Sequence, residues 1–248
     1  MNERLEQETG APAAEWRTVV RHSECDRRGR LKLRSWFDFL QEAAAVHAEQ
    51  LGVGVSMLLE HRMAWVLSRL KLVMETDLRI GDSVVVRTWP NGFHRLFAKR
   101  QYELFRAGRR VGYASSFWLL LEAASLRPLK PSALPRPFPD NSARPEFFPE
   151  LDKLPAPELE AGRLECPVRE SLMDVNGHLN NAEYAGFVQD FLAVVSPEWR
   201  TRQIQINYLN AIRAPDWLAL HGGAANGVYR LAGDNPAGQL CFQAEIIG

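Results

Sequence analysis

Two groups of segments along the chain combine apolar and polar positions over the length of a β-strand. These segments are rich in β-branched and aromatic residues, and short turns such as Pro90-Asn91-Gly92 separate them. They predict strands over residues 65–76, 82–89, 95–106 and 109–121 in the first group, and over 202–209, 216–223, 227–233 and 239–247 in the second.

One amphipathic helix is predicted ahead of each group of strands. Apolar residues recur at helical spacing through residues 36–51, and Ser35 can cap the start of that helix. A second run at the same spacing covers residues 184–195, with Asn180 or Asn181 as its cap. A helix with so wide an apolar face must be covered by the sheet that follows it, which makes the fold class α+β.

The two halves of the chain are copies of each other. When the chain is shifted by 148 positions, eight of 22 aligned residues are identical without a gap. Such a repeat implies two domains of one fold, related by a pseudo-two-fold axis. The identical pairs are Val20 and Val168, Arg21 and Arg169, Ser23 and Ser171, Asp26 and Asp174, Gly29 and Gly177, Leu31 and Leu179, Phe39 and Phe187, and Gln41 and Gln189.

A proline-rich segment separates the copies. Nine of the fifteen prolines lie between Pro128 and Pro157, a density typical of a semi-rigid linker without regular structure. The N-terminal residues are polar and contain no apolar segment of the kind found in a signal peptide. We therefore predict a disordered tail over 1–15, a first domain over 16–125, a linker over 126–160 and a second domain over 161–248.

Composition excludes several classes of function. The 30 basic and 30 acidic residues give no net charge, so no overall field attracts nucleic acid or an anionic membrane. No apolar run reaches the length of a membrane span. The three cysteines have no metal-ligand spacing, which argues against a zinc site or a disulfide framework and favours a reducing cytoplasm. We expect neither a metal nor an organic cofactor.

The segment 174–178 places Asp174, Asn176 and His178 on alternate positions around Gly177, just ahead of the second helix. In a turning loop, alternate side chains can converge on one side. The plainer interpretation is a turn that caps the helix, with the histidine in a structural hydrogen bond. The first copy has Arg28 and Arg30 where Asn176 and His178 stand, so it should not catalyse a reaction.

The sequence resembles the acyl-acyl carrier protein thioesterases of plants and bacteria over nearly its whole length. The phrases that carry the resemblance are LQEAAAVHAEQLG (40–52), WVLSRLKL (65–72), TWPNGFHRLFAKR (88–100) and DVNGHLNNAEY (174–184). The resemblance implies two tandem hotdog domains, each a long central helix wrapped by a curved antiparallel sheet. It also implies a hydrolase that releases free fatty acid from acyl carrier protein in fatty acid biosynthesis.

The family uses an aspartate, an asparagine and a histidine from this motif, which fall on Asp174, Asn176 and His178. By this resemblance, Asp174 holds or activates the base, or itself acts as base or nucleophile; His178 relays a proton; Asn176 orients water or the carbonyl. The glutamate that the family has on the strand after the helix is Ala211 here. Either Asp174 suffices, or another carboxylate reaches the site, or the enzyme is slow or inactive.

The resemblance gives the first domain the acyl pocket, and an acidic carrier protein is the expected partner. Ordinary core residues and a solvated charged face are the plainer interpretations of the two candidate sets. The candidates for the acyl pocket are Trp36, Leu40, Met63, Trp65 and Leu67, and those for carrier docking are Arg27, Arg28, Arg30, Arg95, Lys99 and Arg100.

Three other functions remain open at this stage. One is an acyl-coenzyme A thioesterase, and a second is an acyl-binding or carrier-binding module without turnover, which Ala211 would explain. A hotdog hydratase is disfavoured because its D-x-N-P-x-H motif is one residue longer and contains a proline. The oligomeric state is also open, a homodimer included, because the tandem repeat already supplies the pairing that single hotdogs obtain by dimerising.

Overall fold

Residues 12–248 are described by the computed structural model of the protein, and they fold as two units. Among these residues, unit 1 contains 12–31, 38–70 and 75–151, and unit 2 contains 32–37, 71–74 and 152–248. Most of the expected tail, residues 1–11, lies outside the described part. The expected tail is nevertheless too long, since Ala14 and Glu15 already belong to the first strand, where Glu15 accepts a hydrogen bond from Arg87 (2.6 Å).

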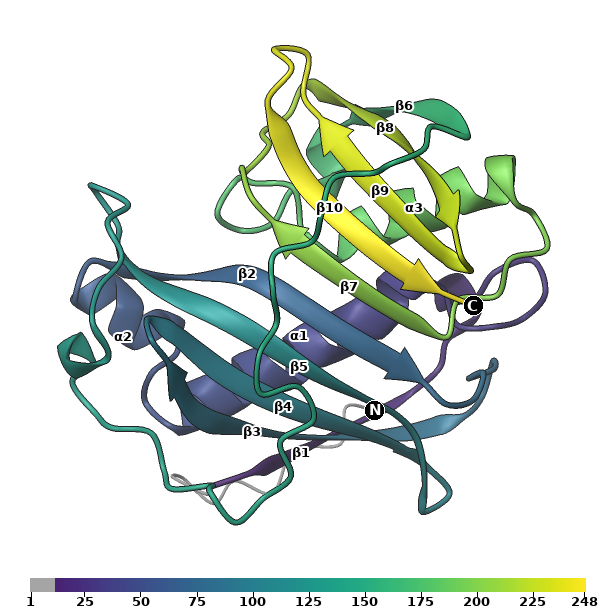
Figure 1. The fold of residues 1–248 in the computed structure, drawn as a ribbon. Coiled ribbons are helices and arrows are strands. Elements are labelled where there is room, and N and C mark those ends of the chain that lie inside the picture. The colour runs from purple at the N-terminus through teal and green to yellow at the C-terminus, as the bar shows by residue number, and fades with distance from the viewer. Residues whose placement is uncertain (1–11) are drawn as a thin grey trace. The chain divides into compact units, whose positions relative to one another are not determined.

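Unit 1 is built on a sheet with the strand order β1-β3-β4-β5-β2. The pairs β1–β3, β3–β4 and β4–β5 are antiparallel. In Figure 1 the long helix α1 lies against one face of these strands. The elements are β1 (Ala14–Val19), α1 (Leu33–Gln50), α2 (Val55–Glu60), β2 (Met63–Met74), β3 (Ser83–His94), β4 (Phe97–Arg106) and β5 (Arg109–Glu122).

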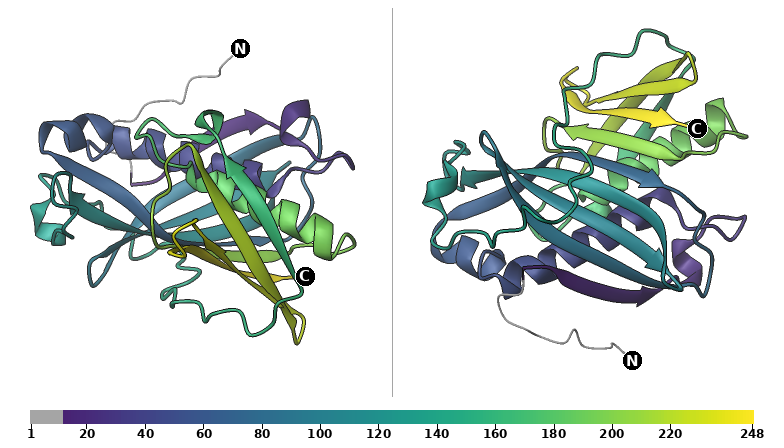
Figure 2. Two further views of the ribbon diagram at one scale, coloured as in Figure 1. Left: turned by 90° about the horizontal axis from the view of Figure 1, so that it is seen from above. Right: turned by 60° about the horizontal axis from the view of Figure 1, so that its bottom comes forward.

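Unit 2 repeats this order of strands, as β6-β8-β9-β10-β7. Its pairs β6–β8, β8–β9, β9–β10 and β10–β7 are antiparallel. Figure 2 shows α3 along one face of this second sheet. The internal repeat seen in the sequence is therefore a repeat of topology. The elements are β6 (Gly162–Val168), α3 (Asn181–Val195), β7 (Gln203–Tyr208), β8 (Asp216–Ala225), β9 (Val228–Asp234) and β10 (Leu240–Ile247).

The two long helices bury the apolar faces predicted from their spacing. Trp36, Leu40 and Ala43 of α1 are buried, as are Phe187 and Phe191 of α3. Across the described residues, no helix is long and apolar enough to cross a membrane.

The boundaries of the helices differ in part from the predictions. The cap predicted at Ser35 is wrong, because α1 already begins at Leu33 and Ser35 is buried inside its first turn. Asn180 does cap α3, since its side-chain oxygen accepts a hydrogen bond from the Ala182 N–H (2.9 Å). The six-residue helix α2 was not predicted.

The turn predicted at Pro90-Asn91-Gly92 is also wrong. Strand β3 continues through these residues to His94, and the chain reverses at Arg95 and Leu96 instead. The register of β3 against β4 shifts between Pro90 and Phe93, so the three residues form an irregularity inside the strand. Gly92 has φ +68°, which suits a bulge where other residues would be strained.

The proline-rich segment is hydrogen-bonded to both sheets. Its first part bonds to the sheet of unit 1, and its last part bonds to the sheet of unit 2. In unit 1 the N–H groups of Phe147 and Phe148 donate to Gln101 (3.2 Å) and Ser115 (3.2 Å). In unit 2 the Asp152 carbonyl accepts a hydrogen bond from Gln205 (3.0 Å). The segment contains one short 3-10 turn, Pro131–Ala133, and otherwise lacks regular structure among its described residues.

Candidate active site

The loop at 174–178 is shaped by the carboxylate of Asp174. Its Oδ1 accepts hydrogen bonds from the N–H groups of Asn176 (2.8 Å) and His178 (3.1 Å). The Asp174 N–H donates to the His178 carbonyl (2.7 Å), and the Gly177 N–H donates to the Asp174 carbonyl (3.0 Å). Gly177 has φ +71°, a conformation that favours glycine. Part of the plainer interpretation therefore holds, since one oxygen of Asp174 is used to build the loop.

The equivalent loop in unit 1 has the same hydrogen bonds. Asp26 Oδ1 accepts from the N–H groups of Arg28 (2.8 Å) and Arg30 (2.9 Å), and the Asp26 N–H donates to the Arg30 carbonyl (2.7 Å). Gly29 also has φ +71°. The backbone of the loop thus does not depend on whether arginine or histidine occupies its last position.

The two loops differ in what happens to the second carboxylate oxygen. In unit 1 the guanidinium of Arg30 covers Asp26 Oδ2 with two bonds, from Nε (3.1 Å) and Nη2 (2.9 Å). Burial raises the pKa of the Asp26 carboxyl, but the hydrogen bonds from Arg30 and Arg28 outweigh it and hold the pKa below its usual value. This aspartate is therefore a fixed anion with little capacity for proton transfer.

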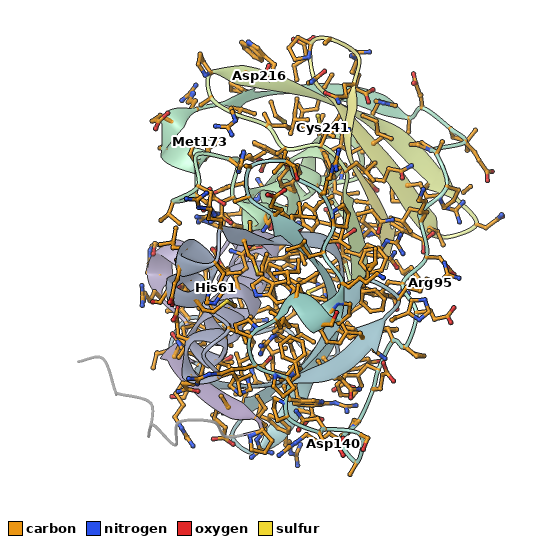
Figure 3. All side chains as sticks on the ribbon, turned by 90° about the vertical axis from the view of Figure 1, so that its left-hand side faces the viewer. His61, Arg95, Asp140, Met173, Asp216 and Cys241 are labelled. Carbon is orange, nitrogen blue, oxygen red and sulfur yellow. The ribbon has the colours of Figure 1, made fainter. Side chains whose placement is uncertain are left out.

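In unit 2 the reactive ends of the side chains stay open. Within residues 12–248, Asp174 Oδ2, the Asn176 amide and the His178 ring make no hydrogen bond to another side chain or to the backbone. Asn176 is exposed and His178 is half-buried. The structure joins Asp174 and His178 through their backbones, and leaves both functional groups available to a bound molecule. In Figure 3, Met173 marks the start of this loop.

The start of α3 lies directly after the loop and offers a hydrogen-bond donor. Leu179 N–H donates to the Ile212 carbonyl (2.8 Å) and Asn180 N–H to the Leu172 carbonyl (3.0 Å), which anchors the connection. The N–H of Asn181, the first helical residue, has no acceptor within the described chain. Unpaired N–H groups at a helix start carry partial positive charge and can bind a carbonyl oxygen or an anion.

Buried aromatic and thiol groups surround this helix start. Tyr184 packs edge-on against Tyr208 (5.3 Å between centroids) and Phe242 (5.1 Å). Burial, and then the charges of Cys241 and Asp174, raises the pKa of Tyr184, so its phenol stays protonated. Burial likewise raises the pKa of the Cys241 thiol to about 11. A thiol that stays protonated at neutral pH is a poor nucleophile, so Cys241 is a packing residue here.

Position 211, where the family has a glutamate and this chain has an alanine, lies beside the loop at 174–178. Ala211 is exposed, and the carbonyl of the next residue, Ile212, accepts the Leu179 N–H described above. A carboxylate at position 211 would therefore belong to the segment bonded to the loop. Sequence reasoning missed Arg213 in the same segment: its Nη1 lies 3.9 Å from where a Cβ on Gly177 would be. No sequence signal distinguished Arg213, because no spacing rule links it to the motif.

The five candidates for the acyl pocket lie in two kinds of environment. Trp36, Leu40 and Leu67 are buried in closed packing. Met63 and Trp65 are half-buried and pack on a cluster beside α2, and the Trp65 ring stacks on Phe138 of the proline-rich segment (6.2 Å). A groove of about 560 Å³ lies next to this cluster. Its lining includes Asn91, Gly92, Phe93, Leu134, Phe138 and Asn141.

The six basic residues expected to dock a carrier protein do not form one surface. The loop that holds Arg27, Arg28 and Arg30 lies at the Ser83 end of β3, where Val20 N–H donates to the Asp82 carbonyl (2.9 Å). Arg95 follows His94 at the other end of this twelve-residue strand, which spans about 40 Å. A single docking patch over all six residues is therefore wrong.

Arg30, Lys99 and Arg100 are held within unit 1. Arg30 is paired with Asp26 and Lys99 with Glu146. Arg100 is 93% buried (7% exposed), so the expectation that it contacts a partner protein at the surface is wrong. Strand β4 is covered on both faces, and the alternation of its side chains turns Arg100 inwards against α1, with its Nη1 on His47 of that helix (3.1 Å). Arg27, Arg28 and Arg95 are exposed.

Comparison with known proteins identifies the family. The model of the acyl-ACP thioesterase N-terminal domain matches residues 14–130, and that of the acyl-ACP thioesterase C-terminal domain matches residues 157–226. An oleoyl-acyl carrier protein thioesterase of Arabidopsis thaliana is 24% identical over 196 residues, 68% of this chain and 52% of that protein. A palmitoyl-acyl carrier protein thioesterase of the same plant is 26% identical over 166 residues, 60% of this chain and 40% of that protein. The matches thus span about half or less of these chloroplastic relatives.

Solved structures share the fold of the whole chain. An acyl-ACP thioesterase from Bacteroides thetaiotaomicron superposes with a TM-score of 0.81 at 20% identity, covering 95% of this chain and 97% of that one. The 12:0-ACP thioesterase from Umbellularia californica gives 0.77 at 16% identity, covering 96% and 97%. The expected tandem hotdog fold is confirmed. With both domain models matched in order and the fold shared from end to end, the chain belongs to the acyl-acyl carrier protein thioesterase family.

Proposed function

We propose that this protein hydrolyses the thioester of an acyl-acyl carrier protein and releases a free fatty acid, in fatty acid biosynthesis in a reducing cytoplasm. The observation that carries the proposal is the contrast between the two loops. One copy closes its carboxylate with Arg30, while the other leaves Asp174 Oδ2 and the His178 ring open beside an unpaired helix N–H. Such an arrangement suits attack of water on a carbonyl.

In the proposed reaction, His178 accepts a proton from water, whose oxygen then attacks the thioester carbonyl carbon. Asp174 stabilises the charged imidazole, and Asn176 orients the water. The oxygen of the tetrahedral intermediate takes the hydrogen bond of the Asn181 N–H. The C–S bond then breaks, and the proton held by His178 passes to the departing thiolate. The products are a fatty acid and the thiol of the carrier, so atoms and charges balance.

A thiol-release assay tests this function. The same acyl chain is presented on acyl carrier protein and on coenzyme A, in a series from octanoyl to octadecanoyl. Release of thiol with higher kcat/KM on the carrier protein supports the proposal, and preference for coenzyme A would make the protein an acyl-coenzyme A thioesterase. The absence of thiol release from every substrate would leave the acyl-binding or carrier-binding module as the function.

Carrier docking predicts an effect of charge reversal on one end of unit 1. Changing Arg27 and Arg28 together to glutamate should raise the Michaelis constant for the carrier-bound substrate about tenfold, because an acidic partner would then meet like charge. The value for the same chain on coenzyme A should change little. Arg95→Glu, at the other end of β3, is the matched control. An equal rise for both donors, or for the control, would reject docking at Arg27 and Arg28.

Ala211 favours the second candidate function, a module that binds acyl carrier protein without rapid turnover. The prediction that separates it from a slow enzyme is Ala211→Glu. If a missing carboxylate limits the reaction, the variant should gain at least about tenfold in kcat, as expected for a general base at this position. Ala211→Gln, of similar size without charge, is the control. An unchanged kcat in active protein would mean that Asp174 already provides the carboxylate that the reaction needs.

A further inference from the structure

A positively charged side chain lies beside the loop at 174–178, and the proposed reaction does not use it. Arg213 follows Ile212, whose carbonyl accepts the Leu179 N–H (2.8 Å), so the backbone of this arginine is held next to the loop. Its Nη1 lies 3.9 Å from where a Cβ on Gly177 would be. All of these residues belong to unit 2. The guanidinium therefore reaches the glycine turn of the loop.

The Arg213 side chain has no partner within the described chain. It makes no hydrogen bond, ion pair or ring contact with any of residues 12–248, and it is exposed. Asp174 does not pair with it, since one oxygen of that carboxylate accepts loop N–H groups and the other makes no ion pair among the described residues. An arginine stays protonated at neutral pH and carries five N–H donors. A full positive charge thus faces solvent beside the loop.

The two copies have an arginine at the same point but use it differently. In unit 1 the Leu31 N–H donates to the Leu78 carbonyl (2.8 Å), which is the counterpart of the bond that anchors the Arg213 segment. The residue after this carbonyl is Arg79. The loop glycine of unit 1 is nevertheless covered by an apolar group, because Ile80 Cδ1 lies 4.0 Å from where its Cβ would be. Only the copy with the open carboxylate has a guanidinium against its loop glycine.

The copies also differ two positions before the arginine. Asp77 precedes Arg79 at that spacing in unit 1, whereas Ala211 precedes Arg213 in unit 2. Ala211 and Arg213 are exposed and the residue between them is buried, so these two side chains face the same side of the chain. A glutamate at position 211 would provide a carboxylate next to the guanidinium. Alanine provides none, which leaves the arginine available to an anion from another molecule.

The substrate of the proposed reaction carries such an anion. Acyl carrier protein and coenzyme A both hold their acyl chain on a pantetheine arm that begins at a phosphate ester. The acyl chain is apolar and must leave water, whereas an exposed arginine meets the polar arm. The planar fork of a guanidinium fits two phosphate oxygens. Asn181, whose N–H takes the carbonyl oxygen, follows Gly177 by four residues, at most about 14 Å of chain, and an extended pantetheine arm is longer than that.

We propose that Arg213 binds the phosphate of the pantetheine arm and so holds the thioester at the loop. This inference rests on the proposed function for its substrate, and it adds a recognition residue for the carrier end of that substrate. The phosphate is common to both acyl donors, so Arg213 serves acyl carrier protein and coenzyme A alike. Ala211 takes part by withholding a counter-ion from the guanidinium.

Two small substrates test the phosphate site. The acyl chain with the highest turnover is attached to phosphopantetheine and to pantetheine, which differ only in the phosphate. The wild-type kcat/KM should be about tenfold or more higher with the phosphate, mainly through the Michaelis constant, as expected for a hydrogen bond between charged groups. Arg213→Met should remove the difference, and Arg213→Lys should keep part of it. Equal wild-type values, or a preference that survives in folded Arg213→Met, would overturn the proposal.

A matched variant and the natural donors separate this site from other effects of charge. Arg163→Met changes an exposed arginine near the start of β6, also in unit 2, and it should keep the wild-type ratio. Thermal unfolding checks that each variant is folded. Arg213→Met should raise the Michaelis constants for acyl carrier protein and acyl-coenzyme A by similar factors. A rise with the carrier protein alone would mean that Arg213 contacts the carrier itself, and it would overturn the phosphate site.

The role given to Ala211 has its own test in the Michaelis constant. Ala211→Glu should raise this constant about tenfold for acyl-phosphopantetheine relative to Ala211→Gln, because the new carboxylate competes with the phosphate for Arg213. The constant for acyl-pantetheine should be the same in both variants, whatever happens to kcat. Equal constants with the phosphate-bearing substrate would show that position 211 does not control the availability of Arg213.

A binding measurement keeps the phosphate site separate from hydrolysis. Calorimetry with the free thiols phosphopantetheine and pantetheine needs no turnover. If the protein hydrolyses no thioester yet binds phosphopantetheine about tenfold more tightly, and loses this difference in Arg213→Met, the proposed function fails while the site stands. If hydrolysis is observed and the phosphate changes neither kcat/KM nor affinity, the site fails while the function stands.

Discussion

Replacing His178 by alanine is expected to lower kcat by about 100-fold or more, the usual contribution of a general base. The imidazole makes no hydrogen bond to the described residues, so its removal breaks no hydrogen bond among them. The backbone bonds of His178 to Asp174 remain in the variant. The Michaelis constant should change little, because the lost interaction belongs to the transition state. Steady-state rates on acyl carrier protein substrates measure both constants.

The control for this variant is His22→Ala, an exposed histidine in the short 3-10 helix before the unit 1 loop. It should keep wild-type kcat. His22→Ala should also unfold within about 0.5 kcal/mol of the parent, as exposed substitutions usually do. Thermal unfolding checks that the protein stays folded when the half-buried His178 is replaced. Near-normal turnover in folded His178→Ala would remove this histidine from the mechanism and leave Asp174 as the base.

The second large effect is expected at Asp174, and the repeat provides its own control at Asp26. In Asp174→Asn the side-chain oxygen that accepts the loop N–H groups is kept, and the charge is lost. We expect kcat to fall about 100-fold, because the imidazolium is no longer stabilised. Asp26→Asn makes the same change in the loop that Arg30 closes, and it should leave kcat unchanged.

Alanine at the two positions separates structure from catalysis. Asp174→Ala and Asp26→Ala each remove an oxygen that accepts two backbone hydrogen bonds. Each should lower the free energy of unfolding by about 1 kcal/mol, since the loop N–H groups can turn to water. Thermal and denaturant unfolding give this value, and thiol release gives kcat. Full turnover in Asp174→Asn would show that the carboxylate only shapes the loop.

The order of the elements could be predicted from two independent signals. One is the pattern of apolar and polar residues within each half, and the other is the similarity between the two halves. The eight strands predicted from their β-forming residues all occur, and the 148-residue shift relates the starts of α1 at Leu33 and α3 at Asn181. Helix α2 was missed because its six residues are too few for a helical period to show. The Pro90-Asn91-Gly92 sequence is a strong turn signal, but pairing of β3 with β4 on both sides of it retains the strand.

The sequence could predict which polar residues share the loop at 174–178, but not how each of them is hydrogen-bonded. The spacing of Asp174, Asn176 and His178 indicated a reactive loop, yet it could not show that one oxygen of Asp174 is bonded to the backbone. The burial of Arg100 was unpredictable for a different reason. Strand β4 has a lysine, an arginine and a glutamine in succession at 99–101, and no local rule says which of them faces the helix. The pairing of β4 with β3 and β5 determines which of these side chains faces α1.

The shared hydrogen bonds of the two loops have an evolutionary consequence. An aspartate and a glycine suffice to build the loop, and the residues that would do chemistry add nothing to its shape. After gene duplication, one copy could therefore exchange its imidazole for a guanidinium without losing its fold.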